Sequence, residues 1–130
     1  MSGIDSINFL NAAMQVREAQ LSVTAGNLAN QDTPNFKAKG IDFKTALAAK
    51  TNNDKVGLQV SDPRHMQAAD VNNGFDVQYV NSGITRADGN TVNSHLEKGK
   101  FAEYELQYQM ALTLSQNKTS SLTGVIKDAR

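Results

Sequence analysis

Two histidines are the first residues to examine for chemistry, because imidazole can bind zinc or act as a base near neutral pH. His65 and His95 lie far apart in the sequence, and the chain contains no cysteine. A zinc site normally needs several clustered ligands, and no His-Glu-x-x-His spacing supplies them here. We therefore interpret His65 as a loop residue and His95 as part of the first turn of a helix, and we expect no metal site and no cofactor.

Nucleophilic catalysis has no better support in the sequence. There is no Gly-x-Ser-x-Gly elbow to present a serine, and the only glycine-containing candidate for a loop motif, Asp88-Gly89-Asn90, is typical of a turn rather than a phosphate-binding loop. Tyr104 and Tyr108 are one helical turn apart, a spacing that favours packing over ligand binding. We therefore expect a protein that is not an enzyme and has no small-molecule substrate.

Composition limits the remaining classes of partner. The chain has 130 residues, which is the size of a single domain, and its 13 basic and 13 acidic residues give a formal net charge of zero. A nucleic-acid-binding protein normally carries a basic surface, so we expect no nucleic acid partner. The first residues lack the basic and apolar regions of a secretory signal. We expect any export to proceed without a cleaved signal peptide.

Two long helical patterns flank a region rich in chain breakers. Ile7, Met14, Leu21 and Leu28 recur every seven residues, which predicts a helix over about 4–29. A second pattern with steps of three and four residues predicts a helix over 94–128. The seam residues that we expect are Ile7, Leu10, Met14, Leu21 and Leu28 in the first helix and Phe101, Tyr108, Leu112 and Leu122 in the second.

The second helix has a clear start and an unusual length. Ser94 and Glu97 have the spacing of a capping box, in which each side chain bonds the main chain of the other. The helix would be roughly 50 Å long at 1.5 Å per residue, whereas a compact fold of this size is roughly 35 Å across. A simple antiparallel hairpin would leave the projecting end uncovered, so we expect the helices to contact other subunits as well.

The middle of the chain is predicted to be loop-rich with short β elements. Pro34 excludes helix at its position, and Asp42 is a plausible cap for a short helix over 41–49. Short strands are predicted near 56–60 and 77–80, and Asp88-Gly89 predicts a tight hairpin between 84–86 and 91–92. The predicted organisation is thus one structural unit in three parts: an N-terminal helix (1–30), a bridging segment (31–93) and a C-terminal helix (94–130).

A resemblance enters at the end of the first helix. The stretch from Asn27 to Lys37 resembles the N-terminal signature of bacterial flagellar rod and hook proteins, and its continuation Gly40-Ile41-Asp42-Phe43 is most similar to the proximal rod members of that family. Farther along, the stretch from Asp88 to Val92, followed by Glu97, resembles the family's turn into its C-terminal helix. The motifs occur in the family's order and at its distances from each end.

The resemblance implies a mainly α fold in which two terminal helices pack as coiled-coil layers of a tubular rod, while the middle segment bridges to neighbouring subunits. It implies a structural, torque-transmitting subunit of the basal body that spans the periplasm and leaves the cell by type III export. The assembly motif that it implies comprises Asn27, Ala29, Asn30, Thr33, Pro34, Phe36, Asp88, Gly89, Asn90 and Glu97.

Partners also follow from the resemblance. They are further copies of the chain, other rod proteins (FlgC-, FlgF- and FliE-like), the membrane ring base and the export apparatus. Two alternatives remain open: a FlgC-like axial protein of the same family, or a soluble helical adaptor or chaperone-like module that never assembles. The adaptor shares the helical stripes but does not account for the two motifs at their matching places.

Overall fold

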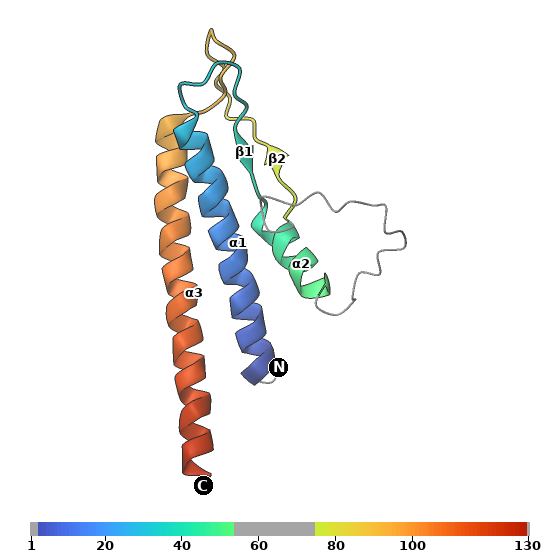
Figure 1. Ribbon diagram of the computed structural model, residues 1–130, viewed down its shortest axis with the longest axis vertical. Helices are drawn as coiled ribbons and strands as arrows, with labels where there is room; N and C mark the ends of the chain where they lie inside the picture. Colours follow the sequence, from blue (N-terminus) through green and yellow to red (C-terminus); the bar gives the residue numbers. More distant parts are fainter. Residues whose placement is uncertain (1–2, 54–74, 130) are drawn as a thin grey trace.

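The computed structural model describes residues 3–53 and 75–129, and over these ranges the protein is mainly helical. The elements follow one another as α1 (Gly3–Ala29), β1 (Lys39–Gly40), α2 (Phe43–Asn53), β2 (Gln78–Tyr79) and α3 (Ser94–Asp128). The two long helices run antiparallel side by side, so both chain ends lie at the same end of the molecule (Figure 1). This confirms the predicted fold class of two long terminal helices around a middle segment with short β elements.

Helix α1 contacts α3 along one side and α2 along another (Figure 1). The predicted seam residues of both long helices are half-buried. The fully buried residues of α1 are instead Val16, three alanines and three polar residues, which are Ala12, Ala13, Ala19, Gln20, Thr24 and Asn27. Small side chains allow neighbouring elements to approach α1 closely, and the seven-residue apolar repeat did not reveal them.

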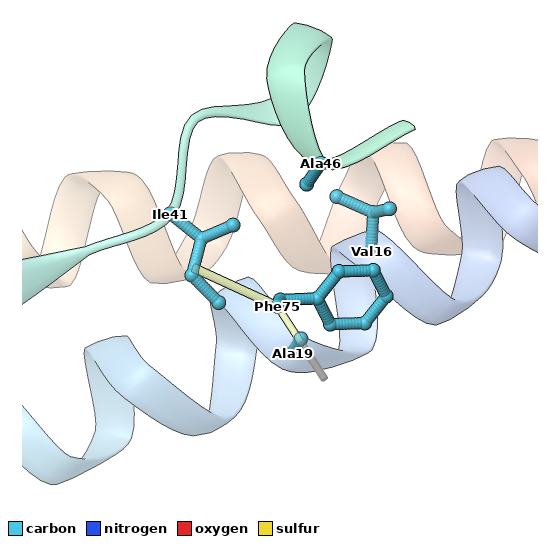
Figure 2. Packing of buried hydrophobic residues seen from close by; sticks show 5 residues of the cluster. All are labelled: Val16, Ala19, Ile41, Ala46 and Phe75. Atoms are coloured by element: carbon cyan, nitrogen blue, oxygen red, sulfur yellow. The ribbon is translucent and has the colours of Figure 1, made fainter. Parts of the chain in front are cut away.

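A buried apolar cluster joins α1 to α2 and to Phe75. Figure 2 shows Val16 and Ala19 of α1 facing Ile41, Ala46 and Phe75. Partly buried apolar side chains surround this cluster, namely Val23, Phe43, Leu47 and Val77. Burying such side chains is the main favourable contribution to folding, so the cluster fixes α2 against α1.

Helix α2 begins where the sequence predicts. Asp42 caps it, because the Thr45 amide donates to Asp42 Oδ2 at 3.0 Å and the Thr45 hydroxyl donates to the same oxygen at 2.6 Å. These two hydrogen bonds hold the pKa of Asp42 below its ordinary value. The helix continues to Asn53, beyond the predicted limit of 49.

Strands β1 and β2 pair antiparallel, with Lys39 opposite Tyr79 and Gly40 opposite Gln78. The strand expected near 77–80 is therefore confirmed, whereas β1 is too short to carry a period-two pattern and was not predicted. The expected strand near 56–60 and His65 lie outside the described residues. Within residues 3–53 and 75–129, no helix combines the length and the hydrophobicity needed to cross a bilayer.

Helix α3 begins at Ser94, but the predicted capping box is wrong. The cap is Asn93, whose side chain accepts from the Leu96 amide at 3.3 Å. The carboxylate of Glu97 turns into the protein and accepts from Asn27 instead. At the far end, a Cβ added to Gly3 would lie 3.7 Å from Cγ of Leu122, so the last residues of α3 extend past the described start of α1.

Candidate functional site: an interlocked helix junction

The chain leaves α1 through a turn that Asn30 organises. The Asn30 amide donates to Gly26 O at 3.1 Å, and its side chain donates to the same carbonyl at 2.8 Å. The Thr33 amide then donates to Asn30 O at 3.1 Å. These bonds satisfy carbonyl groups that a helix end otherwise leaves without a donor. Helix α1 therefore ends at Ala29, before the chain reaches Pro34.

Asn90 connects this turn to the segment that leads into α3. Its side chain is fully buried and donates through Nδ2 to three carbonyl oxygens: Asn30 at 2.9 Å, Gln31 at 3.1 Å and Thr33 at 2.8 Å. Its Oδ1 accepts from the Val92 amide at 2.8 Å. An asparagine amide has two N–H donors, so one of them is shared between two of the three carbonyls, and both polar atoms of this side chain have partners. We call residues 27–39 together with 86–97 the junction.

A close backbone approach explains the glycine of the turn. Gly89 has φ +82°, and a Cβ placed there would overlap Asn35 Oδ1. Asn35 itself has φ 61°, a left-handed conformation that asparagine tolerates better than most residues. The Asn35 amide donates to Asp88 O at 2.9 Å, and Lys37 Nζ donates to Gly89 O at 2.9 Å. The two motifs therefore interlock through their main chains.

Further main-chain bonds continue the contact toward the sheet. The Thr91 amide donates to Phe36 O at 3.0 Å, and the Ala38 amide donates to Thr91 Oγ1 at 2.9 Å. The Val80 amide donates to Ala38 O at 2.9 Å, next to the β1–β2 pair. An exposed ion pair between Arg86 and Asp32 spans 3.5 Å at the outer end of the junction.

Asn27 and Glu97 close the junction between the two long helices. Asn27 is 1% exposed and Glu97 2%. Asn27 Nδ2 donates to Glu97 Oε2 at 3.1 Å and to Lys39 O at 2.7 Å, while its Oδ1 accepts from the Lys39 amide at 3.0 Å. Lys100 Nζ lies 3.8 Å from Glu97 Oε1. A buried carboxylate is costly unless it is paired, so these contacts make the position of α3 depend on α1 and β1.

The residues predicted for the assembly motif thus come together from two distant parts of the sequence. Their side chains divide into three classes. Those that are buried are Asn27, Asn90 and Glu97; those that are half-buried are Asn30, Phe36 and Gly89; and those that are exposed are Ala29, Thr33, Pro34 and Asp88. Thr33 and Asp88 contribute main-chain oxygens, so the exposure of their side chains does not remove them from the junction.

Sequence reasoning missed several contributors. Asn35, Lys39 and Thr91 act mainly through the main chain, which leaves no signature in residue type. Gln20, outside the junction on the packed side of α1, bonds Ile41 O without a local signal, whereas Arg17 is visible in the sequence as a charged interruption of the apolar repeat. The dipeptide Pro34-Asn35 is the one local signal for the left-handed residue, because asparagine is frequent in turns.

The junction has the chemistry of a structural joint. Its buried polar side chains, Asn27, Asn90 and Glu97, all have partners within the junction. The described residues contain no cluster of three or more His, Cys, Asp or Glu side chains that would hold a metal ion. His95 is exposed on the first turn of α3. What this arrangement does is hold the end of one long helix and the start of the other at a set position.

Comparison with known proteins identifies the family. Residues 7–37, which contain most of α1 and the turn that follows it, match the family described as flagella basal body rod protein. The flagellar basal body rod protein FlgB of Aeromonas hydrophila is 34% identical over 88% of this chain and 87% of its own length. FlgB of Cereibacter sphaeroides is 32% identical over 95% and 94%, and FlgB of Proteus mirabilis is 29% identical over 95% and 94%. With identities above 30% over nearly the full length of both chains, this chain belongs to the FlgB family of flagellar basal body rod proteins.

Proposed function

We propose that the chain is a structural subunit of the proximal rod of the flagellar basal body. It assembles with copies of itself and with other rod proteins through α1 and α3, and it acts as part of the shaft that transmits torque. Its role is mechanical rather than catalytic. The observation that carries the proposal is a second apolar face on α3, which α1 leaves uncovered.

This second face lies away from α1. Leu106, Met110 and Leu114 follow one another at four-residue steps and are 59%, 57% and 53% exposed. Tyr104, Ala111 and Ser115, on the other side of the helix, are half-buried against the rest of the protein. A surface helix of a monomer normally has one apolar stripe, and contiguous exposed apolar surface marks an interaction site. The outer face therefore suits packing against another subunit.

The junction supports the same role. Because it holds α1, β1 and α3 together through buried polar bonds, it presents the two antiparallel long helices as one unit. A subunit of a tube needs this, since each neighbour must meet the helices at the same place. Contacts that do not close into a ring generate a helical tube.

The proposal also covers the partners of the subunit and its location in the cell. We infer association with FlgC-, FlgF- and FliE-like proteins, with the membrane ring base and with the export apparatus, in the part of the flagellum that spans the periplasm. Export without cleavage of the N-terminal segment stays a prediction. The FlgC-like alternative is less favoured, because the relatives named above are FlgB proteins.

The test is mass spectrometry of detergent-purified basal bodies from the source cells. The proposal expects this chain at a level comparable to the other rod proteins, with its N-terminal residues intact. Strains lacking the chain should be non-motile and should regain motility with the wild-type copy. Recovery of the chain only as a soluble cytoplasmic protein, absent from basal bodies, would overturn the proposal and favour the adaptor alternative.

A further inference from the structure

We propose that three polar side chains of α1, Arg17, Gln20 and Asn27, determine the axial register at which α1 packs against α3 and α2. The proposal goes beyond the proposed function, because it concerns pairing within one subunit. It holds whether or not the subunit is found in the rod.

The apolar seam alone leaves the register undetermined. Ile7, Met14 and Leu21 repeat every seven residues along α1. In α3, the half-buried positions Tyr108, Ser115 and Leu122 are also spaced by seven residues. Sliding one helix by seven residues, about 10 Å at 1.5 Å per residue, would therefore replace one set of helix contacts by a similar set. Some other feature must disfavour the shifted arrangement.

Arg17 links all three helices at one level. Its guanidinium carbon lies 3.7 Å from the centre of the Phe43 ring in α2 and 5.9 Å from that of Tyr104 in α3. Its Nη1 donates to Gln20 Oε1 at 2.9 Å. A cation stacked on an aromatic face is stabilised by the ring quadrupole. A seven-residue shift separates this charge from Tyr104 or from Phe43, depending on which helix moves.

Gln20 and Asn27 bind main-chain groups of the segment that runs from β1 to the start of α2, and Asn27 also binds α3. Gln20 is 3% exposed and donates through Nε2 to Ile41 O at 2.9 Å. Asn27 bonds both main-chain groups of Lys39 and the carboxylate of Glu97. A shift that brings Gln20 opposite Glu97 also puts Leu10 and Ala13 in the places of Arg17 and Gln20, where they offer no polar group.

In the shifted register, the unfavourable free energy therefore comes from buried polar atoms that lose their partners. Burying a donor or acceptor without a partner is unfavourable, and a buried carboxylate without one is more so. In other helical proteins a single buried polar residue at a seam is known to select one register. Here two buried polar residues, Gln20 and Asn27, act together with the half-buried Arg17 over a distance of ten positions along α1.

The chain has no cysteine, so an engineered pair reports register without interference. Gly3→Cys with Leu122→Cys reports the observed register, since a Cβ at position 3 would lie 3.7 Å from Leu122 Cγ. Gly3→Cys with Ser115→Cys reports a shift of seven residues. Both pairs are oxidised in dilute purified protein, and intrachain disulfides are quantified at monomer mass by non-reducing gel and peptide mapping.

In the otherwise unchanged chain, the first pair should cross-link and the second should not. In the variant R17L/E97L, cross-linking of the second pair should rise about tenfold. Leucine at these two positions has no polar partner to lose, so the shifted register is no longer disfavoured. The control Glu105→Leu makes the same chemical change at an exposed position of α3 and should leave the pattern unchanged. Glu97→Gln keeps an acceptor for Asn27 and should also keep the observed register.

Circular dichroism of each variant shows whether it remains helical. If R17L/E97L is unfolded, cross-linking of the two cysteine pairs is compared in the single variants R17L and E97L instead. Unchanged cross-linking in the helical variants would overturn the proposal, because apolar packing and the remaining bonds of the junction, those of Asn90 among them, would then be enough to set the register. Equal cross-linking of both pairs in the unchanged chain would overturn it as well.

Discussion

The side-chain amide of Asn90 donates to the main-chain carbonyl of Thr33 at 2.8 Å, across a sequence separation of 57 residues. The same amide reaches the carbonyls of Asn30 and Gln31, so one buried side chain closes the turn after α1 and the turn before α3 together. The junction is therefore a single interlocked structure, and its parts should fail together.

Asn90→Ala removes the donor for three carbonyls and the acceptor for the Val92 amide. We expect it to lower the free energy of unfolding by about 3 kcal/mol, because four hydrogen bonds of a buried side chain are lost and the Val92 amide loses its acceptor, although Asn30 O and Thr33 O keep main-chain donors. Asn81→Ala is the control, since Asn81 is exposed and bonds the nearby Gly83 amide; its effect should stay within about 0.5 kcal/mol. Urea denaturation followed by circular dichroism measures both, and equal midpoints would mean that Asn90 does not hold the junction.

Gly89→Ala and Gly83→Ala separate backbone strain from steric contact. Both glycines have positive φ, +82° and +71°, but only at Gly89 would a Cβ meet another atom, the side-chain oxygen of Asn35. We expect Gly83→Ala to cost about 1 kcal/mol and Gly89→Ala about 1–2 kcal/mol more. Equal losses of unfolding free energy would show that Asn35 moves aside at no cost.

Gly26→Ala should stabilise the protein. Gly26 is in α1 without a positive φ, and a Cβ there would meet nothing within 4 Å. Alanine restricts the unfolded chain and favours helix, so the free energy of unfolding should rise by about 1 kcal/mol. Gly40→Ala makes the opposite prediction, since its Cβ would lie 2.6 Å from Val80 Cγ2. A melting temperature for Gly40→Ala above that of Gly26→Ala would contradict both predictions.

Charge on the outer face of α3 should block assembly without unfolding the subunit. Leu106→Glu places a carboxylate where the side chain is already 59% exposed, so the unfolding free energy should change by less than about 0.5 kcal/mol. Incorporation into basal bodies should nevertheless be lost. Leu112→Glu, on the half-buried seam, should lose stability as well as incorporation, and so should a charge at Leu21. Normal incorporation of Leu106→Glu, with Gln109→Glu as the exposed polar control, would remove the outer face from the interface.

Acid should weaken the start of α2. The folded protein holds the pKa of Asp42 below its ordinary value through bonds from Thr45, so on acidification the unfolded chain binds the proton first. The contribution of the cap is therefore present above about pH 4 and is lost as pH falls through the folded pKa. The variant Asp42→Asn keeps a cap acceptor and does not titrate. The stability advantage of the unchanged chain over this variant should shrink on acidification, and a constant difference would contradict the charged cap.

Much of the helical architecture can be predicted from local signals. The seven-residue repeat and the glycine, asparagine and proline breakers place both long helices within a residue or two of α1 and α3. Asp42 caps a short helix through a bond to Thr45, three residues away, and such local bonds leave a readable sequence pattern.

The partners of buried polar groups cannot be predicted in this way. Glu97 has the spacing of a capping box with Ser94, yet its carboxylate bonds Asn27, which is 70 residues distant. The local interaction is exposed to water, whereas the distant one satisfies groups that folding buries, so the distant one prevails. The same reasoning applies to α1, where the apolar repeat indicates the side that meets α3 but carries no information about the small residues that admit α2.

The antiparallel helices α1 and α3 are joined by hydrogen bonds at the junction but only by side-chain packing where Gly3 meets Leu122, which makes the subunit mechanically anisotropic. A force that slides α1 along α3 loads the bonds of Asn27, Asn90 and Glu97 at the same time, so they resist it together. A force that spreads the other ends of α1 and α3 apart breaks the seam contacts one after another, so each contact resists it alone. The subunit should therefore be stiff along its length and should yield first at the end where the two chain termini lie.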